Sequence, residues 1–220
     1  MKKLFLKSAF FLIIAVCFNS CENQEINEQE IEQTNMLNFK SSDLSVNILE
    51  YINIDQNLND KIEEKLRINK NFKFGNDIIV KLQNCKSLEE ITKLFKNGGV
   101  SNSTTILSLL EEKVMFQKLF IKNNPQFYQI SISERTTLVN ELINRQYSVS
   151  TTKGNYETES CASAYNTSSR RCNRDAMIGS TAAIISAAAG LFPGVVAAAY
   201  VMIAHHNCME DAMEDYQACI

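Results

Sequence analysis

The chain has 220 residues, of which 22 are basic, 25 are acidic and 45% are hydrophobic, and it contains no Trp and only two Pro. This length suffices for one domain, or for one domain with a small appendage. The net charge of −3 argues against nucleic acid as a partner, because binding to phosphates depends on clustered Lys and Arg.

The first 20 residues, "MKKLFLKSAFFLIIAVCFNS", have the layout of a secretory signal peptide, with Lys2, Lys3 and Lys7 ahead of an apolar run. The apolar run is shorter than the roughly 20 residues that a membrane-spanning helix needs, so we expect cleavage rather than a permanent anchor. Cleavage would leave 19 of the 22 basic residues against 25 acidic ones, a net charge of −6.

Cys21 follows the residues "FNS", and this stretch resembles the lipobox of bacterial lipoproteins. Phe18 and Asn19 depart from the usual Leu and Ala or Ser of that motif. The resemblance implies that Cys21 becomes the acylated first residue of the mature chain, held at a bilayer by its acyl chains. An ordinary secretory peptide that is cleaved nearby is the alternative.

Residues 21–40 include the acidic, amide-rich stretch "ENQEINEQEIEQTN". Such a stretch cannot bury enough apolar surface to order itself, so it predicts a flexible, solvated tether. An acidic run behind a lipid-bearing cysteine also resembles the surface-export signal of lipoproteins in Bacteroidota. We therefore expect an exported protein, lipid-anchored to a bacterial membrane, at the outer membrane or cell surface. In the alternative, the lipoprotein faces the periplasm and the run is a spacer.

Residues 41–153 predict an all-α body, because their apolar residues recur at spacings of three and four. We expect the first helices over residues 43–54, 59–68 and 76–85. The next helix is bounded by a capping box at Ser87 and Glu90 and by the glycines that follow "SLEEITKLFKN".

The longest predicted helix of the body is "STTILSLLEEKVMFQKLFIKNNP", which ends at Pro125. Its expected inward face carries Ile106, Leu109, Leu110, Val114 and Leu119. A capping box at Ser131 and Glu134 opens one more helix, with an apolar stripe of Leu138, Leu142 and Ile143. The alternating stretch "FYQISIS" predicts an extended connector rather than a strand, since it has no evident partner strand.

Residues 154–220 contain four cysteines: Cys161, Cys172, Cys208 and Cys219. An even set in an exported protein predicts disulfides rather than metal ligands. Each 11-residue spacing returns to one helix face but separates its two cysteines by about 16.5 Å. This is beyond the roughly 7 Å between Cα atoms that a disulfide allows, so each bond must join two helices.

Two antiparallel helices bring together residues whose numbers have a constant sum, and only the nested pairing has one. Cys161 with Cys219 and Cys172 with Cys208 both give 380. A crossed pairing needs parallel helices, which the short connection does not allow. The spacing therefore predicts a disulfide-stapled antiparallel helical hairpin with these two bonds.

The same sum predicts two further contacts between the helices of the hairpin. Arg170 falls opposite Glu210, and Asp175 falls opposite His205. Each prediction places a carboxylate next to a basic or titratable side chain.

Half of that sum marks the expected turn of the hairpin at Gly190. Pro193 and Gly194 stand just beyond it, and residues of these types break helices and make tight connections. We therefore expect the turn at these three residues, with helical arms over about residues 157–189 and 194–218.

Residues 176–204 form an uncharged tip, "AMIGSTAAIISAAAGLFPGVVAAAYVMIA". The breaking residues divide it into arms of about 14 residues, or about 21 Å, which is short of a full bilayer. Its small residues let helices approach closely, in a protein core or in lipid. Two interpretations therefore stay open: the tip packs against the helical body, or it enters a target bilayer.

The composition of the tip and its paired cysteines resemble the hydrophobic hairpins of pore-forming bacteriocins and the peptides similar to halocin C8. The C-terminal third also looks like a family of uncharacterised Bacteroidota lipoproteins that end in a Cys-flanked, Ala/Gly-rich hairpin. That resemblance implies an exported lipoprotein and no assigned activity.

The sequence shows no constellation typical of a metal site or an enzyme. His205 and His206 point about 100° apart on a helix, and His206 with Glu210 lacks a third ligand. Cys85 has no histidine nearby, which favours an inert thiol. We therefore expect no bound metal, no cofactor and no enzymatic activity.

The most economical function is a non-enzymatic structural or interaction lipoprotein. Its expected contacts are a membrane, through the N-terminal lipid, and a protein partner or a target bilayer, through residues 176–204. The alternative is a membrane-active, bacteriocin-like effector that inserts the hairpin tip into a target bilayer.

Overall fold

The computed structural model describes residues 43–68, 72–75, 77–147, 160–187 and 190–220. These residues belong to one compact unit, Phe39–Ile220. The helical body and the hairpin are therefore parts of the same unit. Cys21, the expected tether and the polar stretch before the hairpin lie outside the described residues.

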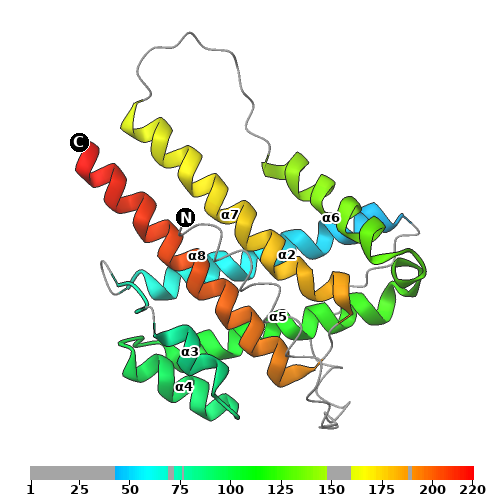
Figure 1. The fold of residues 1–220 in the computed structure, drawn as a ribbon, viewed down its shortest axis with the longest axis horizontal. Helices are drawn as coiled ribbons and strands as arrows, with labels where there is room; N and C mark the ends of the chain where they lie inside the picture. The colour runs from blue at the N-terminus through cyan, green and yellow to red at the C-terminus, as the bar shows by residue number, and fades with distance from the viewer. Residues whose placement is uncertain (1–42, 69–71, 76, 148–159, 188–189) are drawn as a thin grey trace. The chain divides into compact units, whose positions relative to one another are not determined.

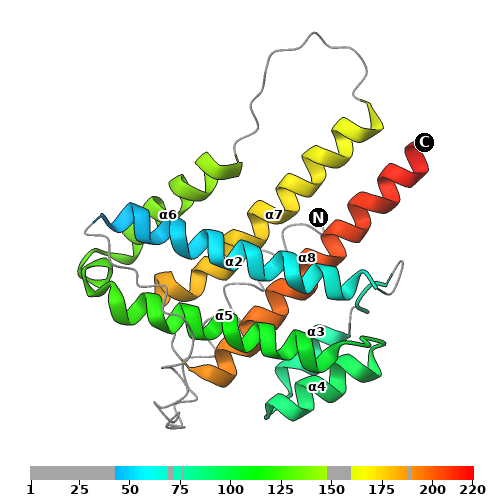
Figure 2. The same ribbon diagram turned by 180° about the vertical axis from the view of Figure 1, so that it is seen from behind.

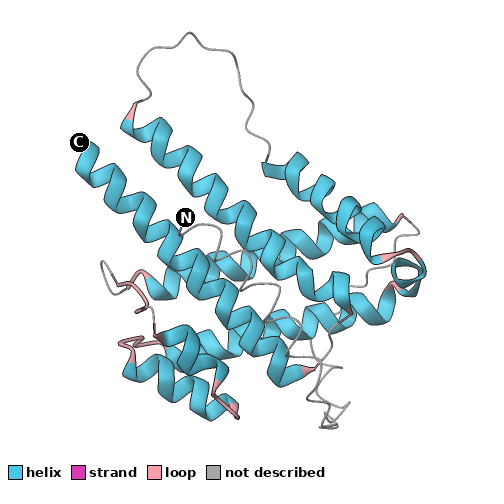
Figure 3. Ribbon diagram, in the orientation of Figure 1, coloured by secondary structure: helices cyan, strands magenta, loops and turns pink. Residues whose placement is uncertain are grey.

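The described residues form helices and no strand, so the all-α prediction is confirmed (Figure 3). In chain order the helices are α2 (Leu44–Leu66), α3 (Ile78–Gln83), α4 (Leu88–Asn97), α5 (Ser103–Asn123), the 3₁₀ helix η2 (Pro125–Gln129), α6 (Ile132–Tyr147), α7 (Cys161–Ser186) and α8 (Leu191–Cys219).

Helices α7 and α8 form an antiparallel pair that crosses α2 and α5. In Figure 1 the pair lies in front, and in Figure 2, seen from behind, α2 and α5 lie in front. Helix α8 packs on α5, α7 packs on α6, and α2 contacts both members of the pair. Helices α3 and α4 pack against each other, α3 against α8 and α4 against α5.

Helix α2 is one continuous helix, so the prediction of two separate helices over residues 43–54 and 59–68 is wrong. Asp55 and Asn59, in the region where the break was predicted, are buried polar residues. Both bind Lys113 of α5. A partner distant in the sequence therefore satisfies the polar groups that would otherwise interrupt the helix.

The predicted capping box at Ser131 is present, and the one at Ser87 is present in part, because the side chain of Glu90 accepts from Lys86 rather than from Ser87. Glu90 donates its backbone N–H to Ser87 Oγ at 3.2 Å, and Glu90 Oε2 accepts from the backbone N–H of Lys86 at 2.8 Å. Ser131 and Glu134 make the reciprocal pair of bonds with each other at 3.2 and 2.9 Å. These bonds satisfy N–H groups that the first turn of a helix leaves without partners.

The stretch that was expected to be an extended connector begins inside the 3₁₀ helix η2. The physical reason is burial: Phe127 has no exposed surface, and its ring lies 5.5 Å from that of Phe120. A tight helical turn after Pro125 points the Phe127 ring into the core, where an extended chain would alternate its side chains across two faces.

Two apolar clusters form the core of this unit, and each buries one helix of the hairpin. The first contains Val195, Ala199, Met202 and Ile203 of α8, together with side chains of α2 to α5. The second contains Met177 and Ile184 of α7, together with side chains of α2, α5, η2 and α6. The described part of the apolar tip therefore packs against the helical body, the first of its two interpretations.

The turn of the hairpin lies earlier than predicted. Helix α7 ends at Ser186, Ala187 adopts a left-handed conformation with φ of 58°, and α8 begins at Leu191 after its N-cap, Gly190. Gly190 therefore borders the turn as expected. The prediction is wrong for Pro193 and Gly194, which lie in the first turn of α8. Proline is accepted there because its missing N–H would have no partner within the helix.

Gly194 has a packing role rather than a turn role. A Cβ at this position would lie 2.8 Å from Cγ1 of Val114, closer than two carbon atoms can pack. The missing side chain therefore lets the start of α8 approach α5 closely.

Candidate functional site

Two disulfides join the helices of the hairpin in the nested arrangement predicted from their spacing. Cys161 is bonded to Cys219 and Cys172 to Cys208, each with a Cα separation of 5.8 Å. This separation lies within the usual range for a disulfide.

We call residues 161–172 and 208–219 the stapled end of the hairpin. Most of its residues are exposed or half-buried. Its two helix segments run side by side away from α3 to α5 (Figure 1). Between the disulfides, the rings of Tyr165 and Tyr216 lie 5.5 Å apart. The stapled end is therefore held by two covalent bonds, one ring contact and the ion pairs of Lys73 with Asp211 and Glu214, rather than by a large apolar core.

The two predicted ionic contacts of the hairpin are wrong. Arg170 and Glu210 form no ion pair in the described structure, and Asp175 lies 3.2 Å from Arg174 instead of meeting His205. His205 meets Asn173, with 2.7 Å between Nε2 and Oδ1.

The reason is helical rotation. Asp175 and His205 each lie three residues from the bond between Cys172 and Cys208, so each is rotated by about 60° from the line where the helices face each other. Both helices are right-handed, so the rotation has the same sense and carries the two side chains to opposite sides of the interface. Arg170 is rotated by about 160° and points away from α8. A constant sum identifies contacts only on the facing line.

A buried cation connects α2, α5 and α7. Lys113 Nζ lies 3.1 Å from Asp55 and 3.3 Å from Ser180 Oγ, and it also donates to Asn59. The side chains of Lys113 and Asp55 are only 5% and 3% exposed. A buried ion pair is strongly destabilised when one partner is removed, so these three helices depend on each other.

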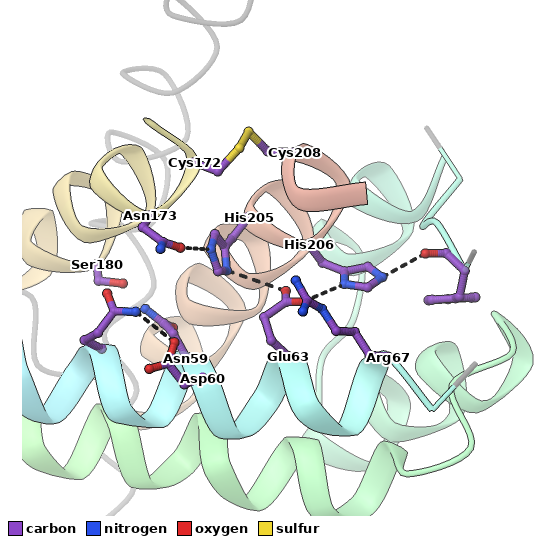
Figure 4. A network of polar contacts seen from close by, with 12 residues as sticks. Asn59, Asp60, Glu63, Arg67, Cys172, Asn173, Ser180, His205, His206 and Cys208 are labelled. Carbon is purple, nitrogen blue, oxygen red and sulfur yellow. Dashed lines mark hydrogen bonds and ion pairs between the residues drawn. A yellow bond between two sulfur atoms is a disulfide. The ribbon is translucent and has the colours of Figure 1, made fainter. Parts of the chain in front are cut away.

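Beside this cation, the carboxylate of Glu63 in α2 faces both histidines of α8 (Figure 4). His206 Nδ1 lies 3.0 Å from Glu63 Oε2, and its Nε2 lies 2.8 Å from the carbonyl oxygen of Phe72. His205 Nδ1 lies 3.5 Å from Glu63 Oε1, while its Nε2 meets Asn173. Both histidines are therefore enclosed by partners from other parts of the fold.

The pKa values of the two histidines are shifted in opposite directions from the ordinary value. Burial acts to lower the pKa of His206, but the hydrogen bond and charge of Glu63, the Phe72 carbonyl and Glu210 together raise this pKa above its ordinary value. Burial lowers the pKa of His205, and the positive charges of Lys113 and His206 act in the same direction, against Glu63 and Asp60. Adjacent residues thus differ because only His206 has a close carboxylate bond.

Residues 72–75 are fixed to α8 by polar contacts that sequence reasoning missed. The side-chain amide of Asn207 accepts from the Phe74 N–H at 2.9 Å and donates to the Phe74 carbonyl at 3.0 Å. Lys73 Nζ lies 2.7 Å from both Asp211 and Glu214. No spacing rule could have found these contacts, because their partners lie more than 100 residues apart in the sequence.

The C-terminal end of α7 is fixed to the body by two side chains. Arg135 Nη1 donates to the carbonyl of Ile185 at 2.6 Å, and the hydroxyl of Tyr128 donates to the carbonyl of Ile184 at 2.9 Å. These carbonyls belong to the last turn of the helix, where backbone donors are scarce: the Ile184 carbonyl also accepts from the Ala187 N–H at 3.3 Å. The hairpin tip is therefore docked by hydrogen bonds as well as by apolar burial.

The other places where a metal, a reactive thiol or a small ligand could be sought show only structural contacts in the described residues. Within the described residues, no group of three His, Cys, Asp or Glu side chains could hold a metal ion. Burial raises the pKa of the Cys85 thiol, and Sγ lies 3.5 Å from the carbonyl of Lys81. A small pocket of about 120 Å³ lies at α3 and α4, and its two charged residues, Asp77 and Lys81, pair with each other at 2.6 Å.

Comparisons of this chain with protein-family models, with curated proteins and with solved structures found no match. The residues and contacts described above are therefore what supports a function for it.

Proposed function

We propose that this chain is an exported lipoprotein, attached to a bacterial membrane through Cys21, with a non-enzymatic structural or interaction role. The observation that carries the proposal is the stapled end, where two disulfides fix helix segments that bury little against the rest of the fold. Disulfides form and persist in oxidising compartments, which supports export. The lipobox-like residues before Cys21 support attachment by lipid.

The enclosure of the histidines supports a non-enzymatic role. His205 and His206 are 6% and 0% exposed. Their ring nitrogens face Glu63, Asn173 and the Phe72 carbonyl. A general acid or base must reach its substrate within hydrogen-bonding distance, and these rings are occupied by structural partners instead.

The stapled end is the surface best suited to contact a partner. The apolar tip, the surface expected from the sequence, contributes Ile184, Val195 and Ile203 to the core. The stapled end is exposed, and its disulfides already fix its conformation. It would therefore lose little conformational entropy when a partner binds to it. We therefore assign the interaction role to residues 161–172 and 208–219.

Acylation can be tested in cells that express the full-length chain with an alkyne-tagged fatty acid. We expect the wild type to carry the label and to sediment with membranes, and Cys21→Ser to lose both properties. Cys85→Ser is the matched control, and it should keep both. An unlabelled wild-type chain in the soluble fraction would rule out the proposed anchor. Protease added to intact cells then separates surface exposure from a periplasmic location.

The membrane-active effector is a second candidate, favoured by one observation. Helix α8 is long and apolar enough to cross a membrane by length and composition. Insertion would require Val195, Ala199 and Ile203 to leave the core, and the hydrogen bonds of Arg135 and Tyr128 to α7 to break.

Dye release from liposomes distinguishes this candidate from the first. An effector should release dye, and Ala187→Arg, which adds a charge at the exposed turn, should abolish the release. If the full-length chain leaves liposomes intact under reducing and oxidising conditions, the effector interpretation fails.

A further inference from the structure

The hydrogen bonds of His206 determine how many protons it carries. Its Nε2 faces the Phe72 carbonyl, which can only accept, so Nε2 bears a proton. Its Nδ1 faces Glu63 Oε2, which accepts when the carboxylate is ionised. With Glu63 ionised, both nitrogens donate and His206 is a buried imidazolium. The pair of Glu63 and His206 therefore holds one proton more than an ionised carboxylate beside a neutral ring.

His205 has the opposite pattern. Its Nε2 faces Asn173 Oδ1, an acceptor, so this nitrogen carries the proton of a neutral ring. Its Nδ1 then directs a lone pair toward Glu63 Oε1, 3.5 Å away. Glu63 Oε1 is buried and has no hydrogen-bond donor in the described structure. Two hydrogen-bond acceptors therefore face each other, and a proton on His205 Nδ1 would let this nitrogen donate to Glu63 Oε1.

We propose that Glu63, His205 and His206 form a two-step proton-binding site that couples the hairpin to α2. The first proton is held between Glu63 and His206 in the native state. The second enters in acid, on Nδ1 of His205, and gives Glu63 Oε1 its missing donor. This site is independent of the proposed lipid anchor and of the partner of the stapled end.

The charges around the site keep the two steps apart. Three charged residues of α2 surround the histidines: Asp60, Glu63 and Arg67. Helix α5 contributes Lys113, and α8 itself contributes Glu210. The nearest polar groups of the other segments are Asn173 of α7 and the Phe72 carbonyl. The second proton must join a buried region that already holds Lys113 and the charged His206. Like charges in a buried site disfavour ionisation, so the two protons bind in separate pH ranges.

Both a lost and an added proton loosen the junction. Without the first proton, a lone pair of His206 faces the Glu63 carboxylate, and α8 loses its bond to α2. With the second proton, an additional buried cation opposes folding, because the unfolded chain binds that proton more readily. The contact between α2 and α8 is therefore most stable with one proton bound.

The chain has only two histidines, so selective ¹⁵N-histidine labelling of the full-length protein reports on this site alone. Long-range ¹H–¹⁵N spectra at pH 6.5, the value of an ordinary histidine, should show His206 mainly with two protonated nitrogens and His205 mainly with its proton on Nε2 alone. A His205→Gln variant assigns the signals. On titration, His206 should lose its proton above pH 6.5, and His205 should gain one below it, on either side of the value of an ordinary histidine. Rings that titrate together near pH 6.5, or in reverse order, overturn the proposal.

A variant and a second readout make the test specific. Glu63→Gln removes the charge that holds the first proton, so the titration of His206 should move to lower pH than in the wild type. If this variant does not fold, the order of titration in the wild type still decides the question. Amide exchange in α2 and α8, corrected for intrinsic rates, should be slowest between the two steps. Exchange that is independent of pH across both steps would refute the coupling of the hairpin to α2.

Discussion

The two halves of the hairpin are stabilised in different ways. Toward the turn, α7 and α8 bury Met177, Ile184, Val195 and Ile203 in the two apolar clusters. At the stapled end the same two helices are largely exposed and carry two disulfides. The crosslinks therefore lie where apolar burial is scarce, as in small exported domains whose cores are insufficient.

This contrast suggests a division of labour along one helical pair. Burial stabilises the packed half by removing apolar surface from water. A disulfide stabilises the other half mainly by restricting the unfolded chain. The predictions below test this division, from the largest expected effect to the smallest.

The packed half also depends on the buried cation, and its removal should have the largest effect. Lys113→Met leaves Asp55 as an uncompensated buried charge, and we expect the free energy of unfolding to fall by about 3–5 kcal/mol. Urea denaturation measures this change. Lys81→Met is the matched control, because its ion pair with Asp77 is exposed and such a pair contributes about 0–1 kcal/mol. Equal losses in the two variants would contradict the role given to Lys113.

Apolar burial in the packed half can be tested with one substitution at two positions of α7. Ile184→Ala removes a side chain with no exposed surface, and we expect a loss of about 2–5 kcal/mol in the free energy of unfolding. Ile178 is 38% exposed, so Ile178→Ala should reduce the same quantity by at most about 1 kcal/mol. The midpoints of thermal or urea unfolding compare the two variants directly. If Ile178→Ala has the larger effect, the packing of α7 described here is wrong.

The stapled end should respond to the loss of its outer disulfide. Replacing Cys161 and Cys219 together by Ser should lower the free energy of unfolding by about 2–4 kcal/mol. Hydrogen exchange should show lost protection in residues 161–172 and 208–219, with α2 and α5 still protected. Cys85→Ser serves as the control because Cys85 is unpaired with another cysteine. Lost protection throughout the unit would show that the two halves are not separable.

The smallest effects are expected at the histidines, and they should have opposite signs. The raised pKa of His206 stabilises the fold below pH 6.5, and this contribution is lost as pH rises through the folded-state value. The lowered pKa of His205 gives a contribution that is present at higher pH and lost as pH falls below 6.5.

Substitution should separate these two contributions. His206→Gln should weaken the decline of stability on the alkaline side, and His205→Gln should weaken the decline on the acidic side. Each effect should be on the order of 1 kcal/mol, as measured by urea unfolding at pH 5, 7 and 9. A change of the same sign in both variants would contradict the opposed shifts.

Residue spacing correctly predicted the features that are determined by residues close together in the sequence or by the geometry of a single helix. The N-cap bonds of Ser87 and Ser131 each join residues three positions apart. The cysteine pairing followed from helical geometry, because 11 residues return to the same face of a helix. These features could be predicted because the spacing contains the whole cause.

Features that depend on distant partners could not be predicted in this way. The continuity of α2 depends on Lys113 of α5, which lies 58 residues from Asp55. The partners of His205 and His206 include Glu63, which lies 143 residues from His206 in the sequence. The only signal for this site in the sequence is the pair of adjacent histidines that follows the apolar tip. Nothing in the sequence indicates that Glu63 lies beside them in the fold.

The nested disulfides also determine how the chain responds to proteolysis. Any single cut between residues 161 and 219 leaves Cys161 and Cys219 on different fragments, and their bond still joins the two pieces. A nicked chain would therefore keep its C-terminal segment attached and in register, and a protease would have to cut outside this span to release it. For a chain proposed to be exported, the disulfides of the stapled end would keep a nicked molecule in one piece as well as stabilise its fold.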